Sequence, residues 1–405
     1  MAYIQGTAND DALTGVAGEG NQINGYDGDD VLVGSDYQDP GITGAAALLQ
    51  GQGGDFLSGG NGNDYLFGKG GNDILHGGAG DDFLDGGDGN DLLRGGAGVD
   101  RYFGGAGDDR ISLFNYDATQ AAHVDLRTQT VYNDGFGNVE QLDSIEGIGA
   151  GTRFADTFIG NNAANTILGD RGDFISGLGG DDIFQIHGAP ASLKGGAGED
   201  TITAFTSYSI TDTDGDGLAE QIYTTNGVIV DLKAGRIVDD GFGNSGDISG
   251  IENVTGSSYN DDITGDNKGN KLDGGSGNDT IDGGGGDDII SGSHGADYLF
   301  GGKGKDVFLF DNAGDSTVDA AGRDLIADFK TGADHIDLSG LQDEVAGGAG
   351  LSLVSGFSGV AGQVVISAIS AGRQSVMVDL NGDGVADFAV DVLSRAALDA
   401  GDLIL

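Results

Sequence analysis

The chain has 405 residues, of which 82 are glycine and 66 are aspartate or glutamate, against 18 lysine or arginine. The formal net charge of −48, with no basic patch to displace counterions, excludes a duplex nucleic acid as partner. The sequence has no cysteine, which excludes a disulfide framework and a thiol nucleophile. Such an acidic chain with 7% aromatic residues is typical of disorder unless cations neutralise the charge.

The first 58 residues contain loose copies of a pattern in which a turn ends in aspartate and an apolar residue follows. Asp11 and Asp30 hold the aspartate position and are the best candidate metal ligands of this segment, and Asn21 replaces the aspartate between them. We expect these copies to cap a repeat structure. The opening MAYIQGTANDD has no basic and apolar segments of a general secretory signal, so none is expected.

Residues 59–112 repeat one nine-residue pattern, Gly-Gly-x-Gly-x-Asp-x-U-x, in which U is a large apolar residue. The aspartates are Asp64, Asp73, Asp82, Asp91, Asp100 and Asp109, and a degenerate unit that starts at Gln50 adds Asp55. The apolar positions are Leu66, Leu75, Leu84, Leu93, Tyr102 and Ile111. Six copies in strict phase argue against a disordered glycine-rich linker.

Each unit suits a glycine turn followed by a three-residue strand with its middle side chain turned inward. Two units then complete one coil of a flattened spiral, and alternate units share an edge. Asp64, Asp82 and Asp100 are expected on one edge. Asp55, Asp73, Asp91 and Asp109 are expected on the other edge.

Carboxylates stacked one coil apart, about 4.8 Å by sheet spacing, repel one another unless a cation lies between them. The turns supply carboxylate and carbonyl oxygens but no sulfur, and such hard donors favour calcium over zinc or copper. The sequence therefore predicts several Ca²⁺ ions as cofactors. The repeats closely resemble those of secreted RTX (hemolysin-type) calcium-binding proteins. That resemblance implies that the aspartates and the turn carbonyls bind calcium between turns on one edge.

After residue 112 the period stops and a module begins that recurs 106 residues later. Residues 124–126, 133–138 and 145–146 reappear at 230–232, 239–244 and 251–252. We interpret the NDGFGN and DDGFGN segments as hairpin turns of β spacers rather than as ligand loops.

A second, imperfect repeat block lies between the two module copies. Asn165, Asp173, Asp182 and Asp200 hold its aspartate positions, and Asp182 and Asp200 are the better candidate ligands. Asp212, Asp214 and Asp216 form a separate DxDxDG loop with the layout of the front half of an EF-hand loop, and residues 379–387 repeat that layout. Each loop is either a stand-alone calcium loop or a solvated turn.

The third repeat block, residues 265–310, returns to strict phase. Its candidate ligands are Asp279, Asp288, Asp297 and Asp306, and Asn270 replaces the first aspartate. From Asp311 onward the chain resembles the C-terminal segment of serralysin-type secreted proteases, on the stretches DSTVDAAGRDLIADFKTGADHIDLSGL and LNGDGVADFAV and the terminal AGDLIL. The resemblance implies a β cap, an uncleaved type I secretion signal and the type I secretion machinery as partner.

The predicted fold is all-β: right-handed parallel β-roll blocks separated by β spacer segments and closed by a C-terminal β cap. The expected domains are an N-terminal β-roll (1–112), spacer copy 1 (113–160), a short β-roll (161–203), spacer copy 2 (204–264), a β-roll (265–310) and the cap (311–405). No pair of histidines forms HExxH, and no G-x-S-x-G is present, so no protease or lipase site is predicted within these residues.

The sequence thus predicts a secreted, non-enzymatic protein that folds on binding calcium outside the cell, as a surface-layer, matrix or adhesion component. Its expected partners include cell-surface polysaccharide or further copies of the chain. One alternative is a polysaccharide-modifying enzyme that uses Asp134, Glu140, Asp143 and Glu146 of the spacer. A second is a calcium-dependent membrane-active protein, for which only residues 345–372 are apolar enough, and stable membrane insertion is not expected.

Overall fold

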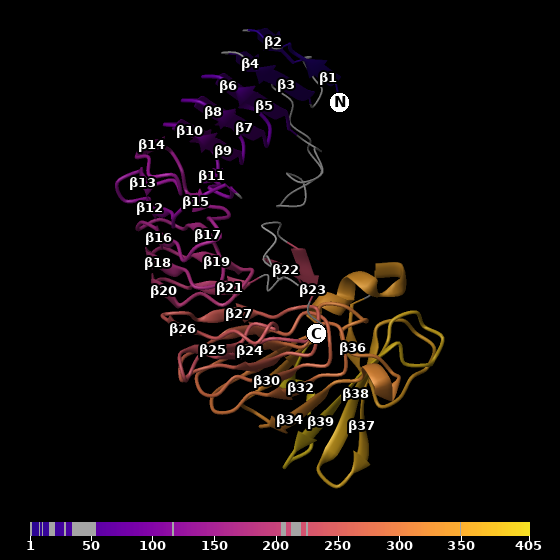
Figure 1. Cartoon of the computed structure of the whole chain (residues 1–405). Helices are drawn as coiled ribbons and strands as arrows, with labels where there is room; N and C mark the ends of the chain where they lie inside the picture. The colour runs from indigo at the N-terminus through magenta and orange to yellow at the C-terminus, as the bar shows by residue number, and fades with distance from the viewer. Residues whose placement is uncertain are drawn as a thin grey trace. The chain divides into compact units, whose positions relative to one another are not determined.

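The computed structural model describes the chain in eleven stretches. They are residues 2–7, 9, 11–15, 21–27, 30–34, 54–115, 117–203, 208–211, 220–223, 226–348 and 350–405. Two compact units are present: residues 1–185 with 190–198, and residues 186–189 with 199–405. Regular structure in the described part is almost entirely β-strand (Figure 1). The predicted calcium loop at Asp212, Asp214 and Asp216 lies outside the described residues.

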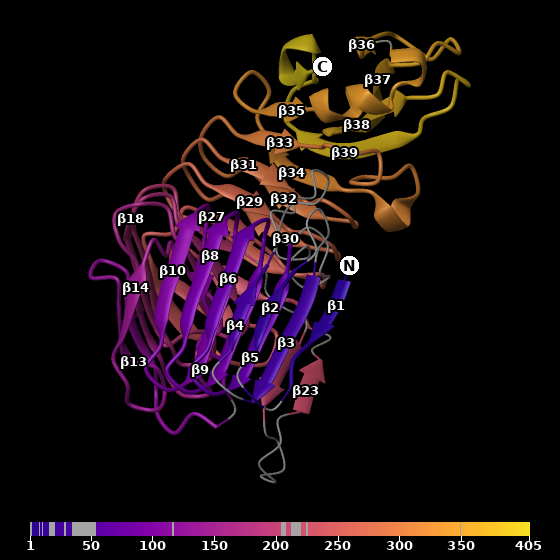
Figure 2. The same cartoon turned by 90° about the horizontal axis from the view of Figure 1, so that it is seen from above.

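The first unit is built from two stacks of parallel strands. One sheet contains β1 (Ala2–Gln5), β3 (Asn21–Asp27), β5 (Phe56–Asn61), β7 (Ile74–Ala79), β9 (Leu92–Ala97), β11 (Arg110–Ile111), β15 (Gly147–Ile148), β17 (Thr166–Gly169) and β19 (Ile183–Ile186). The facing sheet contains β2 (Ala12–Thr14), β4 (Val31–Val33), β6 (Tyr65–Gly70), β8 (Phe83–Asp88), β10 (Arg101–Ala106), β12 (His123–Asp125), β13 (Thr130–Asn133), β14 (Glu140–Asp143), β16 (Thr157–Ile159), β18 (Phe174–Gly179) and β20 (Ser192–Ala197). Figure 2 shows β4, β6, β8 and β10 side by side.

Strands of one sheet pair with a register of eighteen residues, which is one complete coil. Leu66 lies opposite Leu84 across β6 and β8, and Leu75 lies opposite Leu93 across β7 and β9. These four leucines are fully buried, so the apolar position of the repeat lines the space between the two sheets. Burying a leucine contributes about 2 kcal/mol, and the repetition of this position supplies the core.

The turns between strands require glycine because successive coils approach closely. Gly78 has φ +121°, and a Cβ atom there would lie 2.0 Å from the carbonyl oxygen of Gly60 in the preceding coil. No side chain fits at that distance. The predicted β-roll, with two units per coil and alternate units in one sheet, is confirmed.

The spacers interrupt the parallel order with antiparallel strands. In the first copy, β13 pairs antiparallel with both β12 and β14, while β14 also pairs in parallel with β10. Asp134 closes the intervening turn, because its Oδ1 accepts the backbone N–H groups of Phe136, Gly137 and Asn138. The interpretation of NDGFGN as a turn between two strands agrees with this arrangement.

The second unit repeats the architecture. One sheet contains β21 (Thr201–Thr203), β27 (Asn253–Thr255), β29 (Lys271–Asp273), β31 (Ile289–Ser291), β33 (Val307–Leu309), β35 (His335–Asp337) and β40 (Leu403–Ile404). The other contains β24 (Ile229–Asp231), β25 (Arg236–Asp239), β26 (Gly246–Ser249), β28 (Asp262–Thr264), β30 (Thr280–Asp282), β32 (Tyr298–Phe300), β34 (Leu325–Phe329), β36 (Ser352–Leu353), β37 (Gln363–Ser370), β38 (Arg373–Asp379) and β39 (Phe388–Ser394). A separate hairpin joins β22 (Tyr208–Thr211) and β23 (Glu220–Tyr223).

A cap follows the last coil. It contains the antiparallel strands β37, β38 and β39, and four short 3₁₀ helices lie in this part of the described chain. The helices are η1 (Ala320–Gly322), η2 (Ser339–Glu344), η3 (Ala346–Gly348) and η4 (Ala400–Asp402). β39 pairs in parallel with β34, so the cap continues the sheet of the roll. No helix in the described residues is long and apolar enough to cross a membrane.

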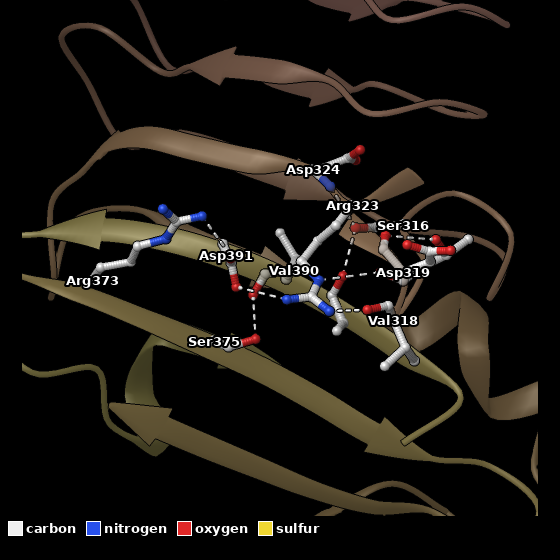
Figure 3. Close-up of polar contacts among 11 residues, drawn as sticks. Ser316, Val318, Asp319, Arg323, Asp324, Arg373, Ser375, Val390 and Asp391 are labelled. Carbon is white, nitrogen blue, oxygen red and sulfur yellow. Dashed lines mark hydrogen bonds and ion pairs between the residues drawn. The ribbon is translucent and has the colours of Figure 1, made fainter. Parts of the chain in front are cut away.

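Polar contacts fasten the cap to the segment that leads out of the roll (Figure 3). The buried Asp391 of β39 forms an ion pair with Arg373 of β38 at 2.7 Å and lies 3.8 Å from Arg323. Ser316 Oγ donates to a backbone carbonyl of β39 and accepts the backbone N–H of Asp324. These contacts fix the position of Asp324, the first acidic residue after the repeats to lie in register with them.

Candidate calcium sites

The aspartates of the repeat form two ladders along the two edges of the roll. The backbone N–H of Asp64 donates to Oδ1 of Asp82 at 2.8 Å, and the N–H of Asp82 donates to Oδ1 of Asp100 at 2.8 Å. On the other edge, Asp73 and Asp91 donate in the same way to Asp91 and Asp109. The structure therefore places these predicted ligands in the two columns that the nine-residue spacing predicts.

The remaining predicted ligands within the described residues occupy the same ladders. Asp30 donates to Asp64, and Asp55 donates to Asp73. In the second unit, Asp279 donates to Asp297, and Asp288 donates to Asp306. Asp182 accepts the N–H of Asn165, and Asp200 donates its N–H to Glu252.

The second carboxylate oxygen, Oδ2, is buried in these ladders without a hydrogen-bond partner. This holds for Asp73, Asp82, Asp91, Asp100, Asp109, Asp279, Asp288, Asp297 and Asp306. Leaving a buried carboxylate oxygen unsatisfied costs several kcal/mol, because the group loses its hydration and gains nothing in return. A row of such oxygens indicates that each faces a charge-compensating ligand.

Carbonyl oxygens converge on the same space as Oδ2. A Cβ atom added to Gly68 would lie 2.3 Å from Asp73 Oδ2 and 2.4 Å from the carbonyl oxygen of Gly86, one coil later. A Cβ atom added to Gly283 would lie 2.4 Å from Asp288 Oδ2 and 3.0 Å from the Gly301 carbonyl oxygen. Each turn thus forms a small cradle lined by a carboxylate and a backbone carbonyl.

Burial raises the pKa values of the ladder carboxyl groups far above their ordinary 3.8. The pKa rises to about 9 for Asp73, to about 8 for Asp82 and to about 7 for Asp91. Desolvation is the main cause, and neighbouring ladder aspartates raise the values further, against a lowering by the backbone N–H bonds. Without a cation, the fold therefore favours protonated aspartates.

The donor set fits calcium, which prefers carboxylate and carbonyl oxygens and accepts irregular geometry. When bound, calcium supplies the positive charge that the buried carboxylates otherwise obtain from protons. No group of three or more histidine, aspartate or glutamate side chains converges on one point within the described residues. In the coils with an unpartnered Oδ2, the aspartate and the turn carbonyls are the residues that would hold the ion.

Acidic residues outside the repeats continue both ladders, a role that the nine-residue period does not predict. Glu140 accepts the N–H of Asp100 at 3.2 Å, and Glu146 accepts the N–H of Asp109 at 3.0 Å. In the second unit Glu252 takes this place after Asp200, and Asp324 and Asp334 take it after Asp297 and Asp306. The recurrence of Glu146 at position 252 in the duplicated module is a sequence signal for these two glutamates, whereas Glu140 has no counterpart because position 246 is glycine.

The DxDxDG layout at residues 379–387 forms a turn whose carboxylates accept backbone N–H groups. Asp379 accepts the N–H groups of Gly382 and Gly384, and Asp387 accepts those of Leu380 and Asn381. These hydrogen bonds account for the loop as a structural turn. For residues 379–387, the calcium loop and the solvated turn both stay predictions.

Comparisons with known proteins identify both parts of the chain. Residues 50–84, 76–111 and 150–173 match the family described as RTX calcium-binding nonapeptide repeat, and residues 208–405 match the family described as Peptidase M10 serralysin C terminal. Metallopeptidase AprA of Pseudomonas marginalis is 42% identical over 92 residues, which are 22% of this chain and 18% of the relative. Metalloprotease AprA of Pseudomonas entomophila (strain L48) is 36% identical over 92 residues, 22% of this chain and 19% of the relative.

The matched stretch spans less than a fifth of the length of these curated relatives. Among solved structures, the AlgE6R2 subunit of the Azotobacter vinelandii mannuronan C5-epimerase is 28% identical. That match covers 38% of this chain and 92% of the subunit, with a TM-score of 0.32. The chain therefore contains RTX calcium-binding repeats, folded as a β-roll, and a serralysin C-terminal domain.

Proposed function

We propose that this secreted calcium-binding protein is a non-catalytic structural component outside the cell, in a surface layer, a matrix or an adhesive contact, and that calcium switches its fold on. The observation that carries the proposal is the row of buried, unpartnered Oδ2 atoms along both edges of the roll. The folded state needs a positive charge at each of these atoms, and calcium is the cofactor of these repeats.

The switch follows from the difference in calcium between the two sides of the export step. Where calcium is scarce, the ladder carboxylates repel one another, and the unfolded chain suits a narrow secretion channel. Extracellular calcium modules bind with dissociation constants of about 10⁻⁴–10⁻³ M. Ions that bind only the folded state stabilise it by mass action, and stacked coils make the response cooperative.

The spacer carboxylates support a structural role over catalysis. Glu140 and Glu146 accept ladder N–H groups, and Asp134 accepts three N–H groups of its own turn. Each is thus occupied by backbone donors of the fold. Contacts with cell-surface polysaccharide or with further copies of the chain belong to this proposal as its biological partners.

Far-UV circular dichroism of the full chain, titrated from EGTA into millimolar calcium, tests the switch. We expect a cooperative transition from coil to β-structure with calcium and no transition with magnesium, which keeps its water shell. A chain that is already β-structured in EGTA at neutral pH would contradict the proposal.

A matched pair of variants separates ladder charge from surface charge in the same titration. Asp82→Asn removes a buried ladder carboxylate, whereas Asp81→Asn removes the neighbouring exposed one. We expect Asp82→Asn to raise the calcium midpoint several-fold and Asp81→Asn to leave it nearly unchanged. Equal shifts would mean that only net charge matters.

A further inference from the structure

The second residue of each turn adopts one of two backbone conformations. In the turns that precede an unpartnered Oδ2, this residue has a positive φ, for example +121° at Gly78 before Asp82 and +89° at Gly275 before Asp279. The same holds for Lys69, Gly87, Gly96, Gly105, Gly284, Ser293 and Gly302, which lie four residues before Asp73, Asp91, Asp100, Asp109, Asp288, Asp297 and Asp306.

The fold imposes this conformation even where the residue is not glycine. Lys69 has φ +83°, Leu178 has φ +81°, Tyr26 has φ +81° and Ser293 has φ +59°, and all four hold the second position of a turn. A left-handed conformation costs an L-residue roughly 1–2 kcal/mol. A strain repeated at one position of the repeat indicates a requirement of the site rather than of a single turn.

A second class of turns, called closed turns below, lacks the positive φ. In a closed turn the backbone N–H of the second residue donates to the side chain of the residue that ends the same turn. Thr152 and Ser257 have no left-handed φ, and their backbone N–H groups donate to Oδ2 of Asp156 and Asp261 at 2.6 Å and 2.5 Å. Their hydroxyl groups donate to Oδ1 of the same aspartates. In these turns both carboxylate oxygens are satisfied by the protein.

Two further closed turns carry asparagine in place of the aspartate. The N–H groups of Asn161 and Asp266 donate to Oδ1 of Asn165 and Asn270 at 2.7 Å and 2.8 Å. The side-chain amides of Asn165 and Asn270 donate to the carbonyl oxygens of Glu146 and Glu252, both at 2.8 Å. A hydrogen bond here joins two coils at the place where an ion would otherwise bridge a side chain and a carbonyl.

The closed turns are unsuited to a cation because the N–H group directs its positive end at the carboxylate. The donor supplies the partial positive charge that calcium supplies elsewhere, so the ion gains less from binding. Asp173 belongs to this class as well, since its Oδ2 accepts the N–H of Asp170. Asp324 of the cap, which follows helix η1, fits neither class.

Four of the closed turns lie where the chain returns from a spacer to the roll, and Thr7 and Lys330 close the turns of Asp11 and Asp334 in the same way at the start of the roll and in the cap. Thr152–Asp156 ends spacer copy 1 and Asn161–Asn165 follows it, just as Ser257–Asp261 ends spacer copy 2 and Asp266–Asn270 follows that copy. Each pair contributes one turn to each edge of the roll. Each return to the roll therefore starts with one complete coil held by hydrogen bonds.

We propose that the second residue of each turn decides whether the turn binds calcium, and that the first coil after the antiparallel strands of each spacer closes without the ion. Where the second residue is left-handed, Oδ2 receives no N–H group, and where its φ is negative, its own N–H group donates to the side-chain oxygen. The inference rests on the calcium-dependent folding proposed above, and it assigns that dependence to some coils and not to others.

The first test counts calcium ions bound to the full chain by equilibrium dialysis. Asp279→Asn and Asp261→Asn alter neighbouring positions of one ladder, since the N–H of Asp261 donates to Asp279 at 2.8 Å. We expect Asp279→Asn to lose at least one bound ion and Asp261→Asn to lose none, with folding checked by circular dichroism in saturating calcium. Loss of as many ions from Asp261→Asn as from Asp279→Asn would overturn the proposal.

The second test adds a ligand rather than removing one, so that it does not depend on a weakened fold. Asn270→Asp restores the aspartate of the repeat but keeps the closed turn, and we expect no additional ion. Asn270→Asp combined with Asp266→Gly also restores a second residue that can adopt positive φ, and we expect one additional ion. An extra ion in the single variant, or none in the double variant, contradicts the rule.

The ion counts remain readable whatever calcium does to the fold. A chain that is β-structured in EGTA yet shows the expected counts would overturn the folding switch and leave the rule for the second residue intact. A chain that folds on calcium but shows the opposite counts would overturn the rule alone.

Discussion

At the scale of single residues, two side chains of each repeat join one coil to the next in opposite directions. The aspartate that ends the turn accepts an N–H from the preceding coil. The residue before it often accepts an N–H from the following coil, as Asn72 does from Asn90 and Asn278 does from Ala296. In the folded roll the two sets of bonds fix the spacing of the carbonyls.

Substitution of Lys69 measures the free-energy cost of a left-handed conformation at the second position of the turn. Its φ of +83° is unfavourable for a lysine but not for glycine. We expect Lys69→Gly to stabilise the calcium-bound roll by about 1 kcal/mol relative to Lys69→Ala. The alanine variant is the control, because it also loses the contact of the lysine with Phe67 but keeps the strain.

Denaturant unfolding in saturating calcium measures this difference. A glycine variant no more stable than the alanine variant would show that the turn relaxes around a side chain. The conformational account of the second residue would then be wrong at this position.

Much at this scale could be read from the sequence, because the nine-residue period assigns each aspartate to an edge and each apolar residue to the core. Glu140 and Glu146 could not be found in that way. Glu140 is forty residues from Asp100, and only the β12–β14 hairpin brings it into register. The positive φ of Lys69 could not be predicted from the sequence either. The repeat favours glycine at this position, and the fold determines the backbone angle of the lysine that replaces it.

At the scale of the elements, the ladder itself is the unit that responds to its surroundings. Each carboxylate is buried beside the next, so its protonation depends on the whole row. At spacer copy 1 each row ends on a glutamate, because Glu140 and Glu146 accept the N–H groups of the last repeat aspartates, and beyond the spacer Asp156 accepts the N–H of Ala122 instead. Within each row, the acids whose Oδ2 has no hydrogen-bond partner have to be charge-compensated by calcium or by protons.

The calcium-free ladder should therefore respond to pH in a defined direction. In the fold, burial raises the pKa of Asp91 and Asp279 to about 7 and that of Asp73 to about 9, above the ordinary 3.8. A raised carboxyl pKa stabilises the folded state below about pH 4 and loses this contribution as the pH rises through about 7–9. In EGTA we expect more β-structure at pH 4 than at pH 8, measured by circular dichroism.

Calcium should remove most of this pH dependence, because the ion replaces the protons. Its binding at neutral pH should release protons into a weakly buffered solution, which a pH electrode detects. A calcium-free chain that gains β-structure as the pH rises would contradict the assignment of the raised pKa values to the ladder.

At the scale of the whole molecule, the net charge of −48 sets the behaviour of the free chain. Repulsion among the carboxylates expands an unfolded chain, and calcium removes the repulsion at the moment when the core leucines become buried. The two parts identified by comparison, repeats and C-terminal domain, share this dependence, because the cap residues Asp324 and Asp334 accept N–H groups from the last repeat aspartates.

Small-angle X-ray scattering measures the change at this scale. For 405 residues an unfolded chain has a radius of gyration of about 70 Å. We expect a value of this order in EGTA and a fall to roughly half or less in millimolar calcium. Magnesium at the same ionic strength is the control, and an equal fall in magnesium would mean that simple screening compacts the chain.

The eighteen-residue register also determines which insertions and deletions in the repeats are compatible with the fold. Loss or gain of one whole coil within a regular block, by slippage between its near-identical repeats, leaves every strand opposite an equivalent partner. Loss of a single nine-residue unit moves everything downstream to the opposite edge, so that a hairpin built to follow β10 would meet the wrong sheet. Lineages of this protein should therefore differ in length by even numbers of repeats.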